Sequence, residues 1–347
     1  GIWRINCGFK FSGAPPRMKI VQYAMRGNPV DVVKVLDVDA PVAGPGEVVL
    51  DVQASPINPS DVLTITGDYG ILPPLPAYCG NEGVGLVVAL GEGVDDVVVG
   101  QQVFLPIGAG TWRQQITAKA AELVPVPPGT DPLQMAMLAI NPPTAYLMLR
   151  DFVRLDPGDW MIQNAANSGV GRYVIQLAAA QGAKSINIVR RADLAEELKA
   201  MGADAVVVEG PGMAKEVRDI TGGAPLKLGL DAIGGDSTLA LGDCLTDDGL
   251  VVNYGLLSGE PCKLSSAATI FHDVSLRGFW LARWFRSAPI GERMAVMTEI
   301  GARVATGELT AAVDSTYDLD HIGDALARSM APGRDGKVLV TPNGPLS

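Results

Sequence analysis

The sequence predicts an α/β protein in which a doubly wound parallel sheet follows a compact, partly barrel-like β domain. Three observations lead to this prediction. From Lys19 to about Thr117, short β patterns are separated by Pro and Gly, with no helical pattern between them. From Pro132 onward, helical and strand patterns alternate. Within that second part, Asp159 to Arg191 has the strand–turn–helix–strand order of a nucleotide-binding unit.

The β part contains predicted strands and one long irregular segment. The strands cover 19–23, 32–38, 47–54, 83–90 and 102–105. Between two of them lies PINPSDVLTITGDYGILPPLPAYCGNEG, residues 56–83, which is rich in proline and holds Tyr69, Asn81 and Glu82. Long loops inside compact domains usually carry function, so we expect part of a site here.

The α/β part is predicted to run through regular alternation. Helices are expected at 132–150, 193–201, 213–221 and 236–246, and strands at 160–163, 186–189, 205–208, 227–232, 250–254 and 274–281. A helix at 288–306, a strand at 313–317, a helix at 320–330 and a strand at 337–341 follow. Periodicity leaves open whether these last elements extend the α/β domain or return to the β domain.

The composition of the chain excludes several classes of function. The 347 residues, 48% hydrophobic and 19% charged, suffice for two domains with their own cores. A formal net charge of −11 argues against binding nucleic acid or an anionic membrane surface, and no apolar run reaches transmembrane length. The four scattered cysteines show neither metal-site nor disulfide spacing, which favours a reducing compartment. We expect a cytoplasmic protein, with the mitochondrial matrix as the alternative.

Residues 1–17 are basic and acid-free, and a strand pattern opens at Met18. A single serine, little amphipathic order and two adjacent prolines distinguish them from a transit peptide. We interpret them as a tag or an upstream extension and leave them out of the fold prediction.

The turn NAANSGVG, residues 164–171, predicts the phosphate-binding site. Gly169 and Gly171 let the backbone approach a pyrophosphate at the positive end of the following helix. Ser168 stands where a full GxGxxG motif has its middle glycine, so a simple glycine turn is the alternative interpretation. About 20 residues after the turn, NAD-binding folds carry Asp or Glu. This chain has Arg190 and Arg191, which suit a ribose 2′-phosphate and therefore predict NADPH.

Several segments resemble one known family. They are NPSDVLTITGDYG, GNEGVG, GTWR, NPPTAYLML, IQNAANSGVG, INIVR, VNYG and LRGFWLARW. They are similar to segments of the medium-chain dehydrogenase/reductase superfamily and, within it, of the zinc-free, mitochondrial-type 2-enoyl thioester reductases, also called trans-2-enoyl-CoA or enoyl-ACP reductases. The resemblance covers nearly everything after Met18. It implies a Rossmann NADPH-binding domain at 140–283, inserted into a GroES-like catalytic domain built from 18–139 and 284–347.

The resemblance implies NADPH-dependent reduction of the carbon–carbon double bond of a trans-2-enoyl thioester. Hydride would reach the β carbon and a proton the α carbon, through an enolate whose oxygen needs a donor. Tyr69 matches the family's catalytic tyrosine, placed to hydrogen-bond the thioester oxygen or to protonate the α carbon. Without the resemblance, a locally packed loop tyrosine would be the simpler interpretation.

Cofactor contacts are implied in the same way. Relatives often carry one more arginine where this chain has Ala192, which leaves a weaker or differently shared phosphate clamp as an open alternative. Core packing is the alternative for the aromatic residues. The implied contacts are Asn141 on the nicotinamide side; Asn167, Ser168, Gly169 and Val170 in the phosphate turn; Arg190 and Arg191 at the 2′-phosphate; Tyr254 and Gly255 at a strand end; Phe279, Trp280 and Leu281 past the nicotinamide; and Lys337 as a distal contact.

No metal is expected. The superfamily's zinc alcohol dehydrogenases take ligands from a cysteine and a GHE-type histidine, whereas this chain has Gly80, Asn81 and Glu82 there. Zinc favours Cys and His ligands, and both histidines lie far from this segment. Cys79 has no partner cysteine nearby and is interpreted as a small buried hydrophobe.

Two other functions stay open. The first is an NADPH:quinone reductase, which needs no proton donor aligned with an alkene, and the second is a non-catalytic NADPH-binding protein. For the enoyl reductase, the expected substrate is a small-molecule acyl thioester of CoA or of acyl-carrier protein. The residues Arg283, Arg286 and Arg293 form either a patch for an acidic carrier or a solvated helix face. A homodimer is expected through an edge strand at 274–280.

Overall fold

The computed structural model describes residues 15–346, and its strands form three sheets. Of the predicted upstream extension, residues 1–14 lie outside the described part, and the first strand begins at Arg17. A three-stranded antiparallel sheet has the order β2-β1-β4. Its strands are β1 (Arg17–Tyr23), β2 (Val33–Asp39) and β4 (Ala77–Tyr78).

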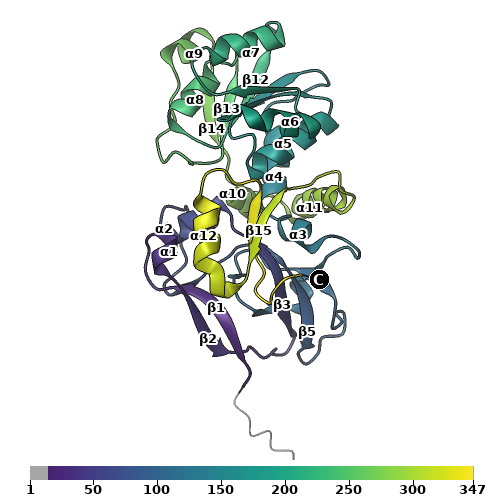
Figure 1. Cartoon of the computed structure of the whole chain (residues 1–347). Coiled ribbons are helices and arrows are strands. Elements are labelled where there is room, and N and C mark those ends of the chain that lie inside the picture. The colour runs from purple at the N-terminus through teal and green to yellow at the C-terminus, as the bar shows by residue number, and fades with distance from the viewer. Residues whose placement is uncertain (1–14, 347) are drawn as a thin grey trace, which may run out of the picture.

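The second sheet joins strands from both ends of the chain. Its order is β15-β16-β3-β5-β6-β8, with β7 also paired to β3. The C-terminal strands β15 and β16 are parallel to each other, and β16 pairs antiparallel with β3. In Figure 1 the last elements accordingly lie beside the first ones. The strands are β3 (Glu47–Pro56), β5 (Val84–Leu90), β6 (Gln102–Phe104), β7 (Gln115–Lys119), β8 (Val124–Pro125), β15 (Val313–Tyr317) and β16 (Lys337–Val340).

The third sheet is six-stranded and parallel throughout, with the order β11-β10-β9-β12-β13-β14. The order reverses at β9, between β10 and β12, as in doubly wound nucleotide-binding folds. The predicted α/β class with a parallel Rossmann-type sheet is therefore confirmed. The strands are β9 (Trp160–Gln163), β10 (Lys184–Val189), β11 (Ala205–Val208), β12 (Leu226–Asp231), β13 (Leu250–Asn253) and β14 (Ser275–Gly278).

Helices cover the parallel sheet and connect it to the rest of the chain (Figure 1). Short 3-10 turns lie at Ala120–Glu122, Ala192–Leu194 and Leu319–His321. The α-helices are α1 (Pro29–Val32), α2 (Pro59–Thr66), α3 (Pro132–Ala136), α4 (Asn141–Asp151), α5 (Gly169–Ala180), α6 (Ala195–Ala200), α7 (Met213–Thr221), α8 (Gly235–Gly242), α9 (Ser266–Phe271), α10 (Leu281–Ser287), α11 (Ile290–Ala305) and α12 (Ile322–Met330).

Several local predictions were wrong, and three of them involve segments that carry predicted site residues. The helix expected at 132–150 is two helices, because Pro142 and Pro143 lack the N–H groups that a continuous helix would need. The segment 56–83 is not wholly irregular, since it contains α2, in which Asp61 accepts a hydrogen bond from the Asn58 N–H and Pro59 occupies the first turn. The strand expected at 274–281 ends at Gly278, and α10 begins three residues later.

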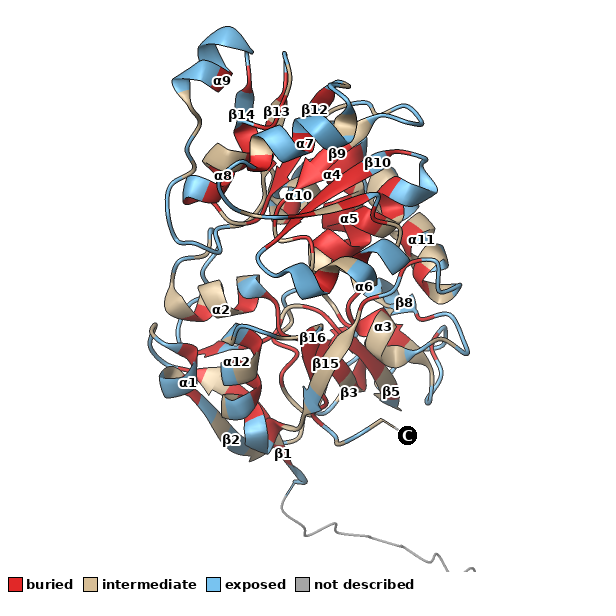
Figure 2. Ribbon diagram, turned by 45° about the horizontal axis from the view of Figure 1, so that its top comes forward, coloured by how far each residue is buried: buried red, intermediate tan, exposed pale blue. Residues whose placement is uncertain are grey.

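The largest apolar core runs across the boundary between the parallel sheet and the other elements. It includes Met148 of α4, Leu177 of α5, Ile300 of α11 and Leu339 of β16, all fully buried. Burying one such aliphatic side chain stabilises the fold by about 1.5–3 kcal/mol. Figure 2 shows this buried interior passing through α4, α5 and the central strands. The two halves of the molecule are therefore held together by a shared core.

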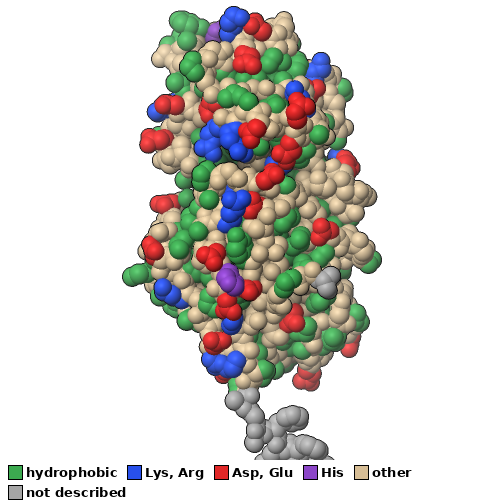
Figure 3. Space-filling view, in the orientation of Figure 1, with side chains coloured by type: hydrophobic (Ala, Val, Ile, Leu, Met, Phe, Trp, Pro, Cys, Tyr) green, Lys and Arg blue, Asp and Glu red, His purple; other side chains and the backbone are tan. Residues whose placement is uncertain are grey.

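The surface carries charges of both signs. On the face seen in Figure 3, Lys and Arg side chains are interspersed with Asp and Glu side chains. The described helices, those of residues 15–346, include none with both the length and the apolar character that crossing a bilayer requires.

Candidate functional site

The phosphate turn connects β9 to α5. Ser168 is the N-cap of α5, and its hydroxyl accepts a hydrogen bond from the Gly171 N–H at 3.1 Å. A Cβ atom on Gly171 would lie 2.6 Å from the carbonyl oxygen of Ala166, so a side chain cannot fit there. The amide N–H groups at the start of α5 and the helix dipole then favour an anion at this end of the helix.

Asn141 and Lys337 lie against this turn, although they come from α4 and β16. A Cβ atom on Gly169 would lie 2.8 Å from Asn141 Nδ2 and 3.4 Å from Lys337 Cδ. Glycine at 169 therefore makes room for both side chains. The structure brings together three of the predicted cofactor residues from three separate elements.

Lys337 is buried, with only 6% of its surface exposed. Its Nζ donates a hydrogen bond to Asn58 Oδ1, the one side-chain partner it has among residues 15–346. An ammonium group has three N–H donors, so two remain for another acceptor. Burial lowers the pKa of Lys337 to about 8, against the opposing effect of nearby Glu82. A buried, under-partnered ammonium beside the phosphate turn fits an oxygen-rich cofactor.

Arg190 and Arg191 directly follow β10, and both side chains are exposed. Arg191 lies 3.5 Å from the Asp193 carboxylate, whereas Arg190 forms no ion pair within the described part of the chain. Two exposed guanidinium groups at the end of the second strand of the unit can hold a phosphate with forked hydrogen bonds. This geometry fits the 2′-phosphate of NADPH.

Tyr254 and Gly255 directly follow β13. The Tyr254 hydroxyl is buried beside the Ser168 side chain and makes no hydrogen bond of good geometry within residues 15–346, and burial raises its pKa well above the usual range. A buried hydroxyl without a partner is costly, which fits a position completed by a ligand. Gly255 has a structural reason of its own, because a Cβ atom there would lie 2.5 Å from the carbonyl oxygen of Ala232.

Tyr69 and Trp280 form a contact across 211 positions of the sequence. Trp280 Nε1 donates a hydrogen bond to Tyr69 Oη at 2.9 Å, and the two rings meet edge to face with centroids 5.8 Å apart. A Cβ atom on Gly70 would lie 2.9 Å from the indole, so the indole packs on the backbone beside Tyr69. Because the Tyr69 oxygen accepts from Trp280, its own O–H proton remains available to donate.

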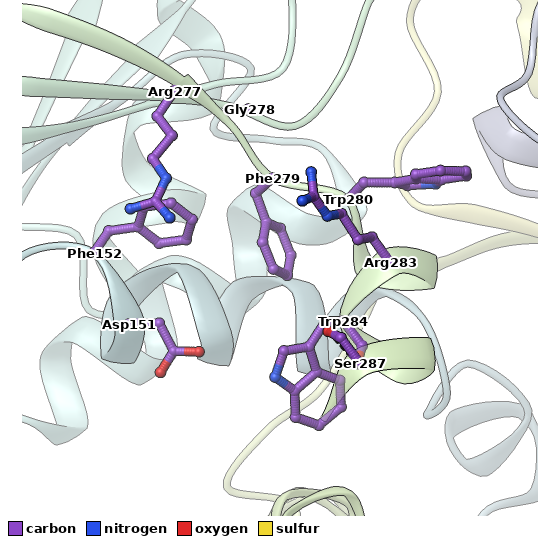
Figure 4. A pocket seen from close by; sticks show the side chains of 9 residues that line it. All are labelled: Asp151, Phe152, Arg277, Gly278, Phe279, Trp280, Arg283, Trp284 and Ser287. Carbon is purple, nitrogen blue, oxygen red and sulfur yellow. Dashed lines mark hydrogen bonds between the residues drawn. The ribbon is translucent and has the colours of Figure 1, made fainter. Parts of the chain in front are cut away.

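Phe279 and Leu281 point elsewhere than Trp280. Leu281 is 9% exposed and packs in the largest core. Phe279 meets Phe152 edge to face at 5.9 Å, and the Arg277 guanidinium lies 5.2 Å from the Phe152 ring centroid. Phe279 and Phe152 both line a cavity of about 510 Å³. In Figure 4 the Phe279 ring lies between Phe152 and Trp280, and the Trp280 side chain points away from Phe152. Phe279 thus belongs to an aromatic pocket beside the Tyr69–Trp280 pair.

The predicted residues near Cys79 do not fit zinc. Burial raises the pKa of the Cys79 thiol far above its usual range, which disfavours the thiolate that binds metal. The carboxylate oxygens of neighbouring Asp61 and Glu82 already accept hydrogen bonds from N–H donors. Across residues 15–346, no group of three or more His, Cys, Asp or Glu side chains is arranged to hold a metal ion.

A buried group of polar side chains, of which the sequence analysis named three of five, links α2, α4 and β16. We call it the Lys337 cluster. Burial raises the pKa of both Asp61 and Glu82 to about 7. Glu82 and Asn141 were noted from the sequence, but Asn58 and Asp61 were not. Their one local signal is the Asn-Pro-Ser-Asp pattern typical of a helix start. The cluster comprises Asn58, Asp61, Glu82, Asn141 and Lys337, all buried.

Arg172 was also missed, because an arginine inside an amphipathic helix is usually solvated. Here it is 3% exposed, and its Nε donates to the Asn167 carbonyl oxygen at 3.1 Å. Its other nitrogens form ion pairs with Glu197 of α6 and, at 3.2 Å, with Asp335. Arg172 therefore ties the phosphate turn to α6 and to the loop before Lys337.

Comparison with protein families gives two matches. Residues 44–128 match the family described as alcohol dehydrogenase GroES-like domain, and residues 169–298 match the family described as zinc-binding dehydrogenase. Among individual relatives, the mitochondrial enoyl-[acyl-carrier-protein] reductase of Bos taurus is 38% identical over 343 residues, which are 97% of this chain and 92% of the relative. The Homo sapiens protein of the same name is 38% identical over 339 residues, 96% and 91% of the two chains.

Solved structures that superpose on this chain include enzymes of the same kind as these relatives. A complex of Etr1p with NADP and crotonyl-CoA superposes with a TM-score of 0.85 and 27% identity, covering 94% of this chain and 100% of that chain. The mitochondrial 2-enoyl thioester reductase Etr1p/Etr2p heterodimer from Candida tropicalis gives 0.85 and 28%, with the same coverage. A Bacillus thuringiensis protein described as a putative NADPH:quinone reductase gives 0.85 and 29%, covering 94% and 99%.

Proposed function

The chain belongs to the mitochondrial-type enoyl-[acyl-carrier-protein] reductases of the medium-chain dehydrogenase/reductase superfamily, and from this membership we propose that it reduces the double bond of a trans-2-enoyl thioester with NADPH and without zinc. The protein is an oxidoreductase. The thioester carrier is CoA or acyl-carrier protein. The similar structure that contains NADP and crotonyl-CoA supports both the cofactor and the substrate class.

The Tyr69–Trp280 pair is the observation that carries this proposal. The indole N–H fixes the Tyr69 oxygen, and the phenolic proton is left to face a substrate. Reduction of an enoyl thioester puts negative charge on the thioester oxygen, which a fixed hydroxyl donor stabilises. The same hydroxyl is placed to supply the proton that the α carbon needs. A quinone has no α carbon to protonate, so this arrangement favours the enoyl substrate.

The remaining predicted residues would hold NADPH. When bound, the cofactor supplies the hydride that reaches the β carbon. Asn167, Ser168, Gly169 and Val170 offer backbone amides to the pyrophosphate, and Arg190 and Arg191 offer guanidinium groups to the 2′-phosphate. Asn141 and Lys337 offer polar contacts beside the turn, and Tyr254 offers its unpartnered hydroxyl.

A zinc-free mechanism follows from the donor groups near Cys79, which do not suit the metal. Proton delivery then falls to Tyr69 or to water. Elemental analysis of the purified protein should find no stoichiometric zinc, and chelators should leave turnover unchanged. One zinc per chain would overturn this part of the proposal.

The second candidate function is NADPH:quinone reduction, favoured by the similar Bacillus thuringiensis structure and by the aromatic pocket of Figure 4. One experiment separates the two functions. NADPH oxidation is followed with crotonyl-CoA and, in parallel, with a quinone. We expect crotonyl-CoA to be reduced with the higher kcat/KM. Turnover with the quinone alone would replace the proposed function by its alternative, and turnover with neither substrate would favour a non-catalytic protein.

We propose a homodimer that pairs through β14. This strand lies at the edge of the parallel sheet, and Leu276 on it is 40% exposed. Ile270 and Phe271 of the preceding helix are 71% and 76% exposed, and such apolar edges favour pairing. Light scattering should give the mass of a dimer, and a monomer mass at micromolar concentration would contradict this.

Two further parts of the account remain proposals. The first is the division into a catalytic domain of 18–139 and 284–347 and an NADPH-binding domain of 140–283, which the sheet order supports because β15 and β16 join β3. The second is location. The names of the relatives favour the mitochondrial alternative over the cytoplasm, and fractionation of the cells that make the protein would decide between them.

A further inference from the structure

Asn58 lies at the centre of the Lys337 cluster. Its side-chain oxygen accepts a hydrogen bond from Lys337 Nζ and one from Asn141 Nδ2, the latter at 3.3 Å. The residue is 2% exposed, and it precedes the first residue of α2. One carbonyl oxygen thus holds two side chains that are 83 and 279 positions away in sequence.

Glu82 determines which way the Asn58 amide points. Asn58 Nδ2 donates to Glu82 Oε1 at 2.7 Å, and the other carboxylate oxygen of Glu82 accepts from the Ala139 N–H at 2.9 Å. An ionised carboxylate can only accept, so the Asn58 NH₂ group must face Glu82. Its carbonyl oxygen must then face Lys337 and Asn141. The hydrogen-bond direction runs from Lys337 through Asn58 to Glu82.

We propose that Asn58, oriented by Glu82, is a positioning residue for the cofactor site, which holds Lys337 and Asn141 against the phosphate turn before NADPH binds. The inference rests on the proposed function, because it takes NADPH as the ligand of that turn. Both held side chains border Gly169, at 2.8 Å and 3.4 Å from the place of a Cβ atom. A side chain fixed in advance loses less entropy on binding, so its fixation strengthens binding.

Glu82→Gln tests the direction of this network. The variant Gln can keep its carbonyl on the Ala139 N–H only by presenting its NH₂ group to Asn58. Asn58 must then rotate, so that its NH₂ group faces Lys337, and Lys337 loses the Asn58 carbonyl oxygen that accepts its hydrogen bond. We expect the Kd for NADPH at pH 8, measured by fluorescence titration without substrate, to rise roughly 10-fold. The KM for NADPH should rise with it, while kcat changes little.

The double variant Asn58→Asp, Glu82→Gln should restore binding. The new carboxylate accepts from Lys337, from Asn141 and from the Gln NH₂ group, and the total charge equals that of the unmutated protein. Asn58→Asp alone places two carboxylates side by side and should weaken binding. We expect the Kd of the double variant to fall within about 3-fold of the unmutated value. A merely structural role for the two residues predicts no such rescue.

Glu47→Gln is the matched control. Glu47 also accepts a hydrogen bond from a backbone N–H, that of Gly44 at 3.0 Å, but it lies at the start of β3 and outside the Lys337 cluster. Its variant should bind NADPH like the unmutated protein. Melting temperatures of all ligand-free variants identify any that fail to fold.

Three outcomes would overturn the inference. They are equal NADPH affinity in Glu82→Gln and the unmutated protein, a double variant no better than the worse single variant, or a Kd in Glu47→Gln that rises as much as in Glu82→Gln. If Glu82→Gln does not fold, Asn58→Asp is compared with the double variant, which must bind more tightly. An unmutated protein that binds no NADPH would instead overturn the proposed function, and this inference with it.

Discussion

The phosphate turn and the Lys337 cluster adjoin each other but are built in opposite ways. The turn comes from one continuous stretch between β9 and α5, and it attracts an anion with backbone amides and a helix dipole. The cluster takes side chains from α2, α4, β16 and the segment before β5, and it buries formal charges. A local motif can therefore form an anion site, whereas the buried polar side chains beside it come together only in the complete fold.

The largest effect is expected where two distant segments meet at Tyr69. Tyr69→Phe keeps the ring and its packing but removes the hydroxyl that is fixed by Trp280. If that hydroxyl stabilises the enolate or delivers the proton, kcat for crotonyl-CoA should fall by about 100-fold or more. Steady-state kinetics measure kcat of the variant, and a titration with NADPH checks that the variant still binds the cofactor. Unchanged turnover would mean that Tyr69 only packs.

The second largest effect is expected on NADPH binding, at the two arginines that follow β10. The double change Arg190→Ala, Arg191→Ala should weaken NADPH binding by roughly 10- to 100-fold and leave NADH binding nearly unchanged, because only the 2′-phosphate is lost as a partner. Titrations of both cofactors against both proteins measure this. Equal affinity of the unmutated protein for NADPH and NADH would refute the assignment of these two arginines.

Gly171→Ala sharpens the comparison within the turn. The added methyl group would lie 2.6 Å from the Ala166 carbonyl oxygen, and such overpacking costs about 1–3 kcal/mol of stability. Gly323→Ala in α12 is the control, because a Cβ atom there meets nothing within 4 Å. It should be neutral or stabilise by about 0.5–1 kcal/mol. Denaturant unfolding of the two variants tests this, and equal stabilities would contradict the account of the turn.

The smallest effect is a pH dependence in the Lys337 cluster. Burial raises the pKa of Glu82 from its ordinary 4.5 to about 7, so Glu82 stabilises the fold below pH 4.5 and loses this contribution as pH rises through about 7. Asp61 changes in the same sense, and the lowered pKa of Lys337, about 8, acts at higher pH. One retained proton corresponds to about 1.4 kcal/mol per pH unit.

Glu82→Gln removes this proton while Asp61 and Lys337 remain. Between pH 5 and 7, the unfolding free energy of the unmutated, ligand-free protein should therefore fall relative to that of the variant, by at most about 1.4 kcal/mol per pH unit. Urea unfolding at several pH values gives both slopes. Parallel slopes would show that Glu82 titrates normally despite its burial.

The features that the sequence predicted are local ones, like the phosphate turn, and the features that it missed depend on distant segments, like the Lys337 cluster. The strands 160–163 and 205–208 and the helix 213–221 were predicted to the residue, because period and turn signals are local. The glycine turn and the two arginines are also local patterns. The break at 137–140 was missed, since the periodicity of apolar residues continues across it and only the proline pair at 142–143 marks it.

The side-chain contacts could not be predicted from local patterns. Asn58 and Lys337 are 279 positions apart, and nothing near either residue indicates the other. The pairing of β16 with β3 brings them together. Tyr69 and Trp280 were named through a family resemblance, but their hydrogen bond needed the fold. The sequence did not indicate Arg172, because its burial depends on α6 and on the loop at Asp335.

The central claim is that this protein transfers hydride from NADPH to the β carbon of an enoyl thioester. The most direct test uses NADPH in which deuterium replaces both hydrogens on C4 of the nicotinamide. This NADPH is incubated with crotonyl-CoA and the protein. The account predicts butyryl-CoA with one deuterium, located at the β carbon by NMR, and a proton from solvent at the α carbon. Butyryl-CoA without the label at the β carbon, or no butyryl-CoA while a quinone is reduced, would contradict it.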